Sequence, residues 1–349
     1  SEAPFGLKGW QVAFMAVGLP GMLLALLTWQ IKEPPRGLSE GLISSESKNP
    51  LKETFKELVG LTPFGLVGSE NFRKELTVNI IFTVSILLTS YYLYILTGDY
   101  LQWTAFGIGV YVICNWIHGL KNRDPVAFLL IFKSKALLLG LLSFPFITFV
   151  TYALGAFGPS FYIRNFSMTA TEVGIIYGLI TVFGSMIGVI CGGILGDKLR
   201  ESYVNGKLYL IMTSAVLTSV TAIGFIHSEN LVASFTWKFF YHIASTAWLG
   251  CAASTVTELV LPRLRAVASA FFILMLSMIG LALGPYLTGM VSDIYINSGL
   301  LPGPALKNAM TLTLVVLVLP FGLLAVACKY LKNDEAEIYE KARSLGEEI

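Results

Sequence analysis

Long apolar runs alternate with short polar segments along the whole chain. A helix rises about 1.5 Å per residue, so about 20 apolar residues cross a hydrocarbon core about 30 Å thick. Only helices and closed barrels satisfy the backbone in lipid, and runs of this length favour helices. The pattern predicts nine membrane-spanning helices, at 10–31, 76–97, 100–120, 128–154, 172–196, 207–227, 234–260, 266–292 and 308–331.

The polar segments divide the chain into five parts. These parts are a first span (1–31), a polar linker (32–74), a hairpin of two spans (75–120), six further spans (121–332) and a charged tail (333–349). Within the linker, apolar residues recur at helical spacing. They predict a helix that lies on the membrane surface or, equally, an ordinary solvated helix. They are Leu51, Phe55, Leu58 and Val59.

The composition favours lipid as the surrounding medium. Hydrophobic residues make up 55% and charged residues 13% of the chain, whereas a soluble domain carries about 25% charged residues. The net charge of +2 is too small to indicate nucleic-acid binding. The four cysteines lie inside apolar runs without a CxxC, and the three histidines form no HExxH. We therefore expect a bilayer as partner, and neither a metal site nor a cofactor.

The basic residues gather on one side of the predicted membrane. With nine spans, 20 of the 24 Lys and Arg residues fall on the side that also holds the C-terminus. Cytoplasmic loops carry such an excess, so this side is predicted to be cytoplasmic. The four remaining basic residues are Lys8, Arg164, Lys238 and Lys307. Because Ser1 is not a methionine, we expect the chain to be a piece of a longer protein.

Glycine recurs every four residues in the span at 172–196, at Gly184, Gly188, Gly192 and Gly196. This spacing places all four on one helix face, where another helix backbone can approach closely. Charges follow at once, at Asp197, Lys198 and Arg200. A carboxylate at this position could accept hydrogen bonds from the N-terminus of a neighbouring helix. The pattern predicts a tight helix pair with a charged contact at its cytoplasmic end.

Several motifs resemble the major facilitator superfamily. The stretch GGILGDKLRE, one spacing short, resembles its GxxxD(R/K)xxRR loop, and Glu258 to Arg265 resembles its ExxxPxxR link. The bend around Gly280, Gly284 and Pro285 is similar to that of its eleventh span. The stretches YALGAFGPSFYIRNF and RLRAVASAFF are most similar to the Spinster-like branch.

This resemblance implies an all-α membrane fold. Residues 10–31 would be the sixth span and 128–331 the complete C-terminal six-helix bundle, with the hairpin as an insertion of unknown role. The first five spans, which belong to the N-terminal bundle of the same protein, would be missing. In the superfamily two bundles rock about a central site. We therefore expect a secondary transporter of a small amphipathic or organic anionic solute, lysolipid-like as in Spinster relatives, in a bacterial inner membrane.

The resemblance also suggests residues with roles. A cytoplasmic charge network that latches one state would comprise Asp197, Lys198, Arg200, Glu258 and Arg265. The alternative is static surface ion pairs, each contributing about 0–1 kcal/mol. Glu258 is the strongest candidate because it ends an apolar run, where charge is costly. Candidates for the substrate cavity are Tyr152, Phe157, Arg164, His242, Ser245 and Trp248.

Alternatives remain open for some of these residues and for the function. Arg164 could be an interface anchor, His242 a packed core residue, and we expect Lys238 to extend its ammonium outward. Proton coupling stays open, since its residues would lie in the missing half. A scaffold or sensor with a transporter fold is the second hypothesis. A membrane-embedded enzyme is the third, and we do not expect it, because no His, Ser and Cys cluster in the sequence.

Overall fold

The computed structural model describes residues 8–32, 49–60, 62 and 72–344. Every regular element in these ranges is helical, which confirms the predicted all-α fold. The chain divides into two units, Ser1–Glu46 and Ser47–Ile349. The first unit contains α1 (Gly9–Thr28), an apolar helix with Pro20 inside it.

The second unit begins with a short amphipathic helix and a hairpin. Helix α2 (Pro50–Gly60) falls in the predicted linker, and its Leu51 and Phe55 are exposed. Residues 33–48, 61 and 63–71 of that linker lie outside the described residues. Helices α3 (Phe72–Thr97) and α4 (Tyr100–Arg123) pack together as a hairpin in the region where 75–120 was predicted to be an inserted pair of spans. Gly98 makes the turn with a φ of 81°, a conformation that suits a residue without a β-carbon.

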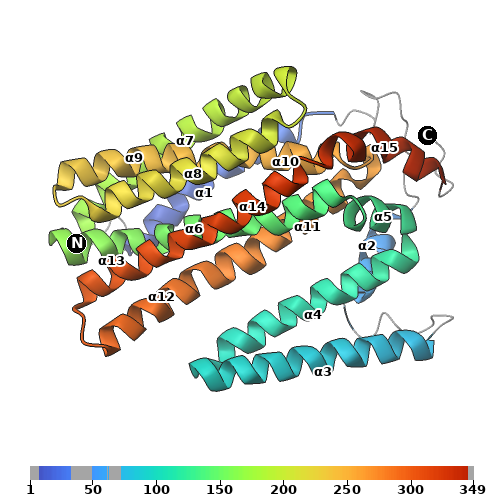
Figure 1. Ribbon diagram of the computed structural model, residues 1–349, viewed down its shortest axis with the longest axis horizontal. Coiled ribbons are helices and arrows are strands. Elements are labelled where there is room, and N and C mark those ends of the chain that lie inside the picture. The colour runs from blue at the N-terminus through green and yellow to red at the C-terminus, as the bar shows by residue number, and fades with distance from the viewer. Residues whose placement is uncertain (1–7, 33–48, 61, 63–71, 345–349) are drawn as a thin grey trace. The chain divides into compact units, whose positions relative to one another are not determined.

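The remaining helices form a bundle and a terminal helix (Figure 1). The bundle comprises α5 (Pro125–Phe132), α6 (Lys135–Phe166), α7 (Ala170–Ser202), α8 (Gly206–His227), α9 (Leu231–Ala247), α10 (Leu249–Glu258), η4 (Pro262–Leu264), α11 (Arg265–Met275), the π-helical η5 (Leu276–Leu281), α12 (Ala282–Asn297), α13 (Pro302–Thr313), η6 (Leu314–Leu317) and α14 (Val318–Ala327). Helix α15 (Leu331–Ser344) follows it.

Helix α6 is the centre of the bundle. It contacts α7, α12, α13 and α14, and its Phe144 and Ile147 are fully buried. The predicted span 128–154 is wrong at both ends, since α6 runs from Lys135 to Phe166. The cause is local: Ser134 is extended and its hydroxyl accepts the N–H of Leu137, so it starts a new helix after α5.

Six helices of the described chain are long and apolar enough to cross a membrane, fewer than the nine predicted. One reason is the span at 234–260, which is two helices that meet at Trp248. There the indole N–H donates to the carbonyl of Ser245 at 2.9 Å. Helix α4 is long but carries polar residues, and α1 counts only as a short apolar helix, Phe14–Thr28. These six helices make the chain an integral membrane protein.

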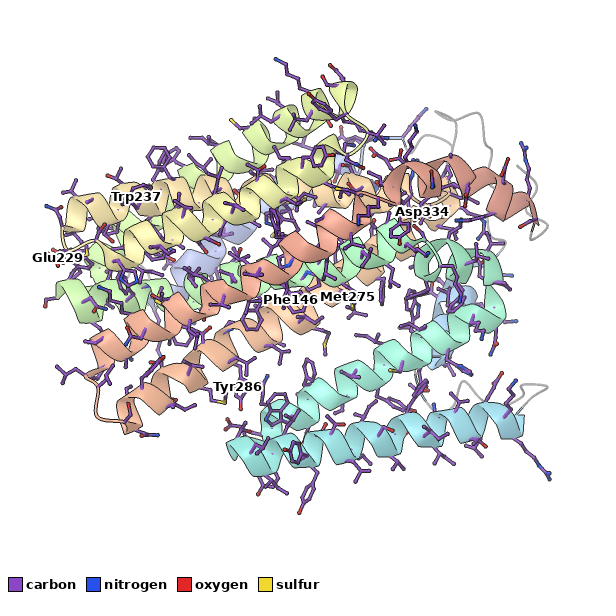
Figure 2. All side chains as sticks on the ribbon, in the orientation of Figure 1. Phe146, Glu229, Trp237, Met275, Tyr286 and Asp334 are labelled. Atoms are coloured by element: carbon purple, nitrogen blue, oxygen red, sulfur yellow. The ribbon has the colours of Figure 1, made fainter. Side chains whose placement is uncertain are left out.

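The hairpin packs on the bundle through α4. The phenol of Tyr286, on the side of α12 that faces the hairpin (Figure 2), donates to Asp99 at 2.7 Å. Gln102 donates to the carbonyl of Ala282 at 3.2 Å. Trp116 stacks on Phe271 with 5.2 Å between ring centroids. These side-chain contacts of the hairpin extend from Phe271 in α11 to Tyr286 near the start of α12.

Candidate functional site

The glycine stripe of α7 is a helix–helix contact. A β-carbon on any of these four glycines would lie within 3.0 Å of an atom in a neighbouring helix. For Gly184, Gly188 and Gly192 that helix is α9, and for Gly196 it is α10. At Gly192 the obstacle is the carbonyl of Ala247, which is backbone and cannot rotate away. Small residues thus bring α7 and α9 together at backbone distance.

A second close contact joins α12 and η5 to α6. A β-carbon on Gly280 would collide with the side chain of Thr148, and one on Gly284 with the carbonyl of Phe149. Pro285 follows within α12 and cannot donate a helical hydrogen bond. Together with the π turn of η5, it places the bend of this long helical segment against the central helix.

Charged residues meet at one end of the bundle, here called the basic end. It comprises the α7–α8 junction, the α10–α11 link and α15. Lys207, only 7% exposed, forms an ion pair with Glu258. The pair joins the start of α8 to the end of α10. The lysine is nearly buried while the glutamate is not, so the carboxylate offsets part of the cost of burying the lysine.

A second ion pair brings α15 into the basic end. Arg200 of α7 donates to Glu335 at 2.7 Å. Arg265 donates from Nε to the carbonyl of Thr257 at 3.2 Å. These groups surround a pocket of about 390 Å³, lined by Arg200, Glu258, Val260, Arg265, Glu335 and Ile338. Three residues of the predicted charge network are therefore gathered at one site.

The other two members of the predicted network lie apart from it. Asp197 and Lys198 are exposed, and neither forms an ion pair or a hydrogen bond with a described residue. The expected contact of Asp197 with the N-terminus of a neighbouring helix is therefore absent from the described residues. The reason is helix geometry: Gly196 faces α10, and the next residue is rotated about 100° from it.

Further contacts fix the basic end. Arg263 donates to Asp124 at 2.6 Å and so ties η4 to the start of α5. Burial raises the pKa of Asp124, but the bonds from Arg263 and the N–H of Ala127 outweigh it and leave the pKa below its usual 3.8. Asp334 of α15 (Figure 2) accepts the hydroxyl of Ser134 at 2.9 Å and the N–H of Ala136 at 2.8 Å.

The cavity candidates on α9 are buried. His242 lies 3.0 Å from the hydroxyl of Thr181 and is 6% exposed. Ser245 and Trp248 are 2% exposed, and the indole stacks against Phe144. In this conformation these three side chains pack between helices.

The cavity candidates on α6 are more accessible. Tyr152 is 42% exposed, and Phe157 is half-buried against Gly289. Arg164 is exposed in the last turn of α6, where a cation is favourable beside the helix C-terminus. The structure therefore does not bring all six candidates to one open surface.

The expectation that Lys238 extends its ammonium outward is wrong, because the side chain is buried. Its exposure is 0%, and its Nζ lies among the rings of Tyr177, Phe225 and Tyr241, at 4.8, 4.2 and 4.4 Å from their centroids. The sequence shows neighbouring aromatics on α9 but not those that α7 and α8 contribute. Lys207 and Glu335 were likewise missed, because their partners are far away in the chain.

Within the described ranges, no three His, Cys, Asp or Glu residues are close enough to hold a metal ion. The four cysteines are free thiols, spread over different helices. Neither observation adds a candidate site to the basic end and the surroundings of Lys238.

Sequence comparisons relate the chain to membrane transport proteins. A Mycolicibacterium smegmatis protein named MFS-type efflux pump is 31% identical over 201 residues, covering 57% of this chain and 45% of that protein. Drosophila melanogaster protein spinster is 27% identical over 172 residues, covering 46% of this chain and 28% of that protein. Human protein spinster homolog 3 is 24% identical over 210 residues, covering 55% of this chain and 41% of that protein. The chain spans less than half the length of each of these relatives.

No protein-family model matches the sequence. Among solved structures, a bacterial homologue of the human lysosomal transporter Spinster, inward-facing and occupied, aligns with a TM-score of 0.47 and 22% identity. That alignment covers 69% of this chain and 58% of the other. Taken with the motifs and the apolar helices, the relatives support a Spinster-like assignment within the major facilitator superfamily.

Proposed function

We propose that this chain is part of a secondary transporter that works by alternating access. The observation that carries the proposal is the basic end. There Arg200, Glu258 and Arg265 surround one pocket, beside a helix pair held by glycines. Ion pairs at a helix end can break when the helices tilt, which a rigid apolar contact cannot do without exposing its surface.

In this proposal the basic end faces the cytosol and latches one state of the cycle. The Lys207–Glu258 pair joins α8 to α10, and the Arg200–Glu335 pair joins α7 to α15. The excess of basic residues on this side supports a cytosolic C-terminus. A second bundle would complete the pathway, and the greater length of the relatives is consistent with it. A bacterial inner membrane is the proposed location.

We infer a small amphipathic or organic anionic solute, lysolipid-like, with proton coupling as an open part of the proposal. The accessible part of α6 offers aromatic surface at Tyr152 and Phe157 and one cation at Arg164. Aromatic walls with few charges suit an apolar body that carries one polar group. The names of the relatives, an efflux pump and Spinster proteins, favour transport over catalysis.

Counterflow tests this function. The full-length protein is reconstituted in liposomes preloaded with an unlabelled solute, and entry of the labelled solute is followed. The panel holds lysophosphatidate, a fatty acid and lysophosphatidylcholine, so that head-group charge varies. We expect trans-stimulated entry for at least one anionic member, and a clear loss of it in Glu258→Gln.

The matched control is Asp197→Asn, which removes an exposed carboxylate at the same end without breaking an ion pair. It should retain most of the counterflow. Binding of a solute without any counterflow would favour the scaffold or sensor alternative. Chemical conversion of a panel member would favour the enzyme.

A further inference from the structure

Lys238 is a cation enclosed in the apolar part of the bundle. It lies two turns inside α9, which packs side by side with α7 and α8 (Figure 1). The preceding residue, Trp237, is on the outer surface of α9 (Figure 2) and is 41% exposed, whereas Lys238 is 0% exposed and faces the interior. A charge at this depth is costly and commonly marks a functional site.

The surroundings of Lys238 provide rings instead of acceptors. Its Nζ has no hydrogen-bond partner in the described chain, and no carboxylate there forms an ion pair with it. Three rings contribute cation–π attraction, which is weaker than a bond to an anion. The nearest ionisable groups on the packed helices are Tyr177, Tyr241 and His242, none of which carries a negative charge near neutral pH. The amine of Lys238 therefore has no counter-ion within the described chain.

Tyr177 separates this ammonium from an accessible face of the bundle. Its ring is 4.8 Å from Nζ, and its hydroxyl donates to the carbonyl of Gly155 on α6 at 3.4 Å. Gly155 is exposed, and so is Gly174, one turn before Tyr177. Gly158 leaves the space that the phenol fills, since a β-carbon there would collide with it. One long hydrogen bond and edge contacts with the rings of Tyr162 and His242 thus hold the ring beside Lys238.

We propose that Lys238 binds the acidic head of an amphipathic solute when Tyr177 moves aside. A phosphate or carboxylate would supply the acceptors that the rings lack, through charge-assisted hydrogen bonds. The same rings would then contact the first carbons of the solute. This inference rests on the proposed transport of an amphipathic anion and names the group that recognises it.

The test measures binding to the full-length protein in phosphatidylcholine nanodiscs. The probes are dodecyl phosphate, dodecyl trimethylammonium and inorganic phosphate, which separate an amphiphile head from a free anion. Loss of a charge-assisted contact corresponds to a factor of about 10–100 in Kd. We expect Lys238→Met to weaken dodecyl phosphate binding by about that factor.

Two further variants sharpen the test. Lys307→Met removes a half-buried lysine predicted on the same side of the membrane, and dodecyl phosphate should bind to it with less than about a twofold change, as expected for a screened distant charge. Tyr177→Phe keeps the ring and removes the bond to Gly155. It should tighten binding by up to a few fold, because the open state becomes more populated.

The outcomes separate this inference from the proposed function. If dodecyl phosphate binds equally to Lys238→Met and to the unmodified protein, and melting curves show that both are folded, the anion site is overturned even if counterflow persists. Preference for the trimethylammonium probe does the same. Counterflow that fails for every solute removes the transport proposal, whereas Lys238-dependent phosphate binding would still support the site. Lys238-dependent binding of inorganic phosphate alone supports the site and assigns it to a free anion.

Discussion

The basic end and the aromatic enclosure around Lys238 each contain a buried lysine, but they surround it with different partners. Lys207 is 7% exposed and is paired with the carboxylate of Glu258. Lys238 is 0% exposed and is surrounded by three rings. The first arrangement is complete in the present conformation, and the second lacks an anion. In the proposed transport cycle, the ion pairs at the basic end stabilise this conformation, whereas Lys238 would meet its anion in another one.

The largest effect should come from separating the helices that support both regions, since Tyr177 and Arg200 both lie on α7. Gly192→Val places side-chain atoms against the carbonyl of Ala247. We expect a loss of about 3 kcal/mol or more of unfolding free energy, at the upper end of overpacking effects. Thermal unfolding in detergent measures it. Gly193→Val is the control, because nothing lies within 4 Å of a β-carbon there; equal melting of the two variants would contradict the proposed packing.

A double-mutant cycle probes the pair at the basic end. Glu258→Gln should destabilise the protein by about 1–2 kcal/mol, less than for a fully buried pair because the Glu258 side chain is 42% exposed. Adding Lys207→Met should recover part of this loss, since no unpaired ammonium then remains. Additive losses, measured by unfolding in mixed micelles, would mean that the two side chains act independently.

Lys238→Met should have the opposite sign from Glu258→Gln. Removing an ammonium without a counter-ion should leave stability unchanged or raise it by about 1 kcal/mol, because lost cation–π attraction is offset by relief of desolvation. Melting temperatures of the two variants in the same detergent provide the comparison. If Lys238→Met is the more destabilised, the rings alone satisfy the ammonium and the contrast between the regions disappears.

Asp124→Asn should give the smallest effect. The hydrogen bonds of Asp124 lower its pKa below 3.8, so its contribution is fully present above that pH and is lost as pH falls through the lower folded value. Because the side chain is 30% exposed, we expect less than about 1 kcal/mol near pH 7. The difference in melting temperature from the unmodified protein should shrink below pH 4. A constant difference from pH 3 to pH 7 would exclude this origin.

Local patterns in the sequence predicted much of the fold but little of the pairing. The spacing of Gly184 to Gly196 predicts one packed face, because four residues are close to one helical turn. The partner of Glu258 could not be predicted, since Lys207 lies 51 residues away and meets it only through the crossing of α8 and α10. The break between α9 and α10 at Trp248 could not be predicted from hydropathy, because the run 234–260 is apolar on both sides of it.

The position of Lys238 was mispredicted for a similar reason. Lys238 lies near the start of the predicted span 234–260, where a lysine generally reaches water, and the sequence of α9 alone gives no reason against it. Tyr177 and Phe225 come from α7 and α8, so the enclosure exists only once three helices pack.

Asp334 has a consequence for the order of biosynthesis. It accepts the N–H of Ala136 and the hydroxyl of Ser134, 198 and 200 residues earlier in the chain. The first turn of the central helix therefore waits, during translation, for a segment that leaves the ribosome almost 200 residues later. Until then these two donors must be satisfied by water or lipid head groups, and a ribosome stalled before α15 would hold a bundle whose central helix has its Ser134 cap but lacks both bonds to Asp334.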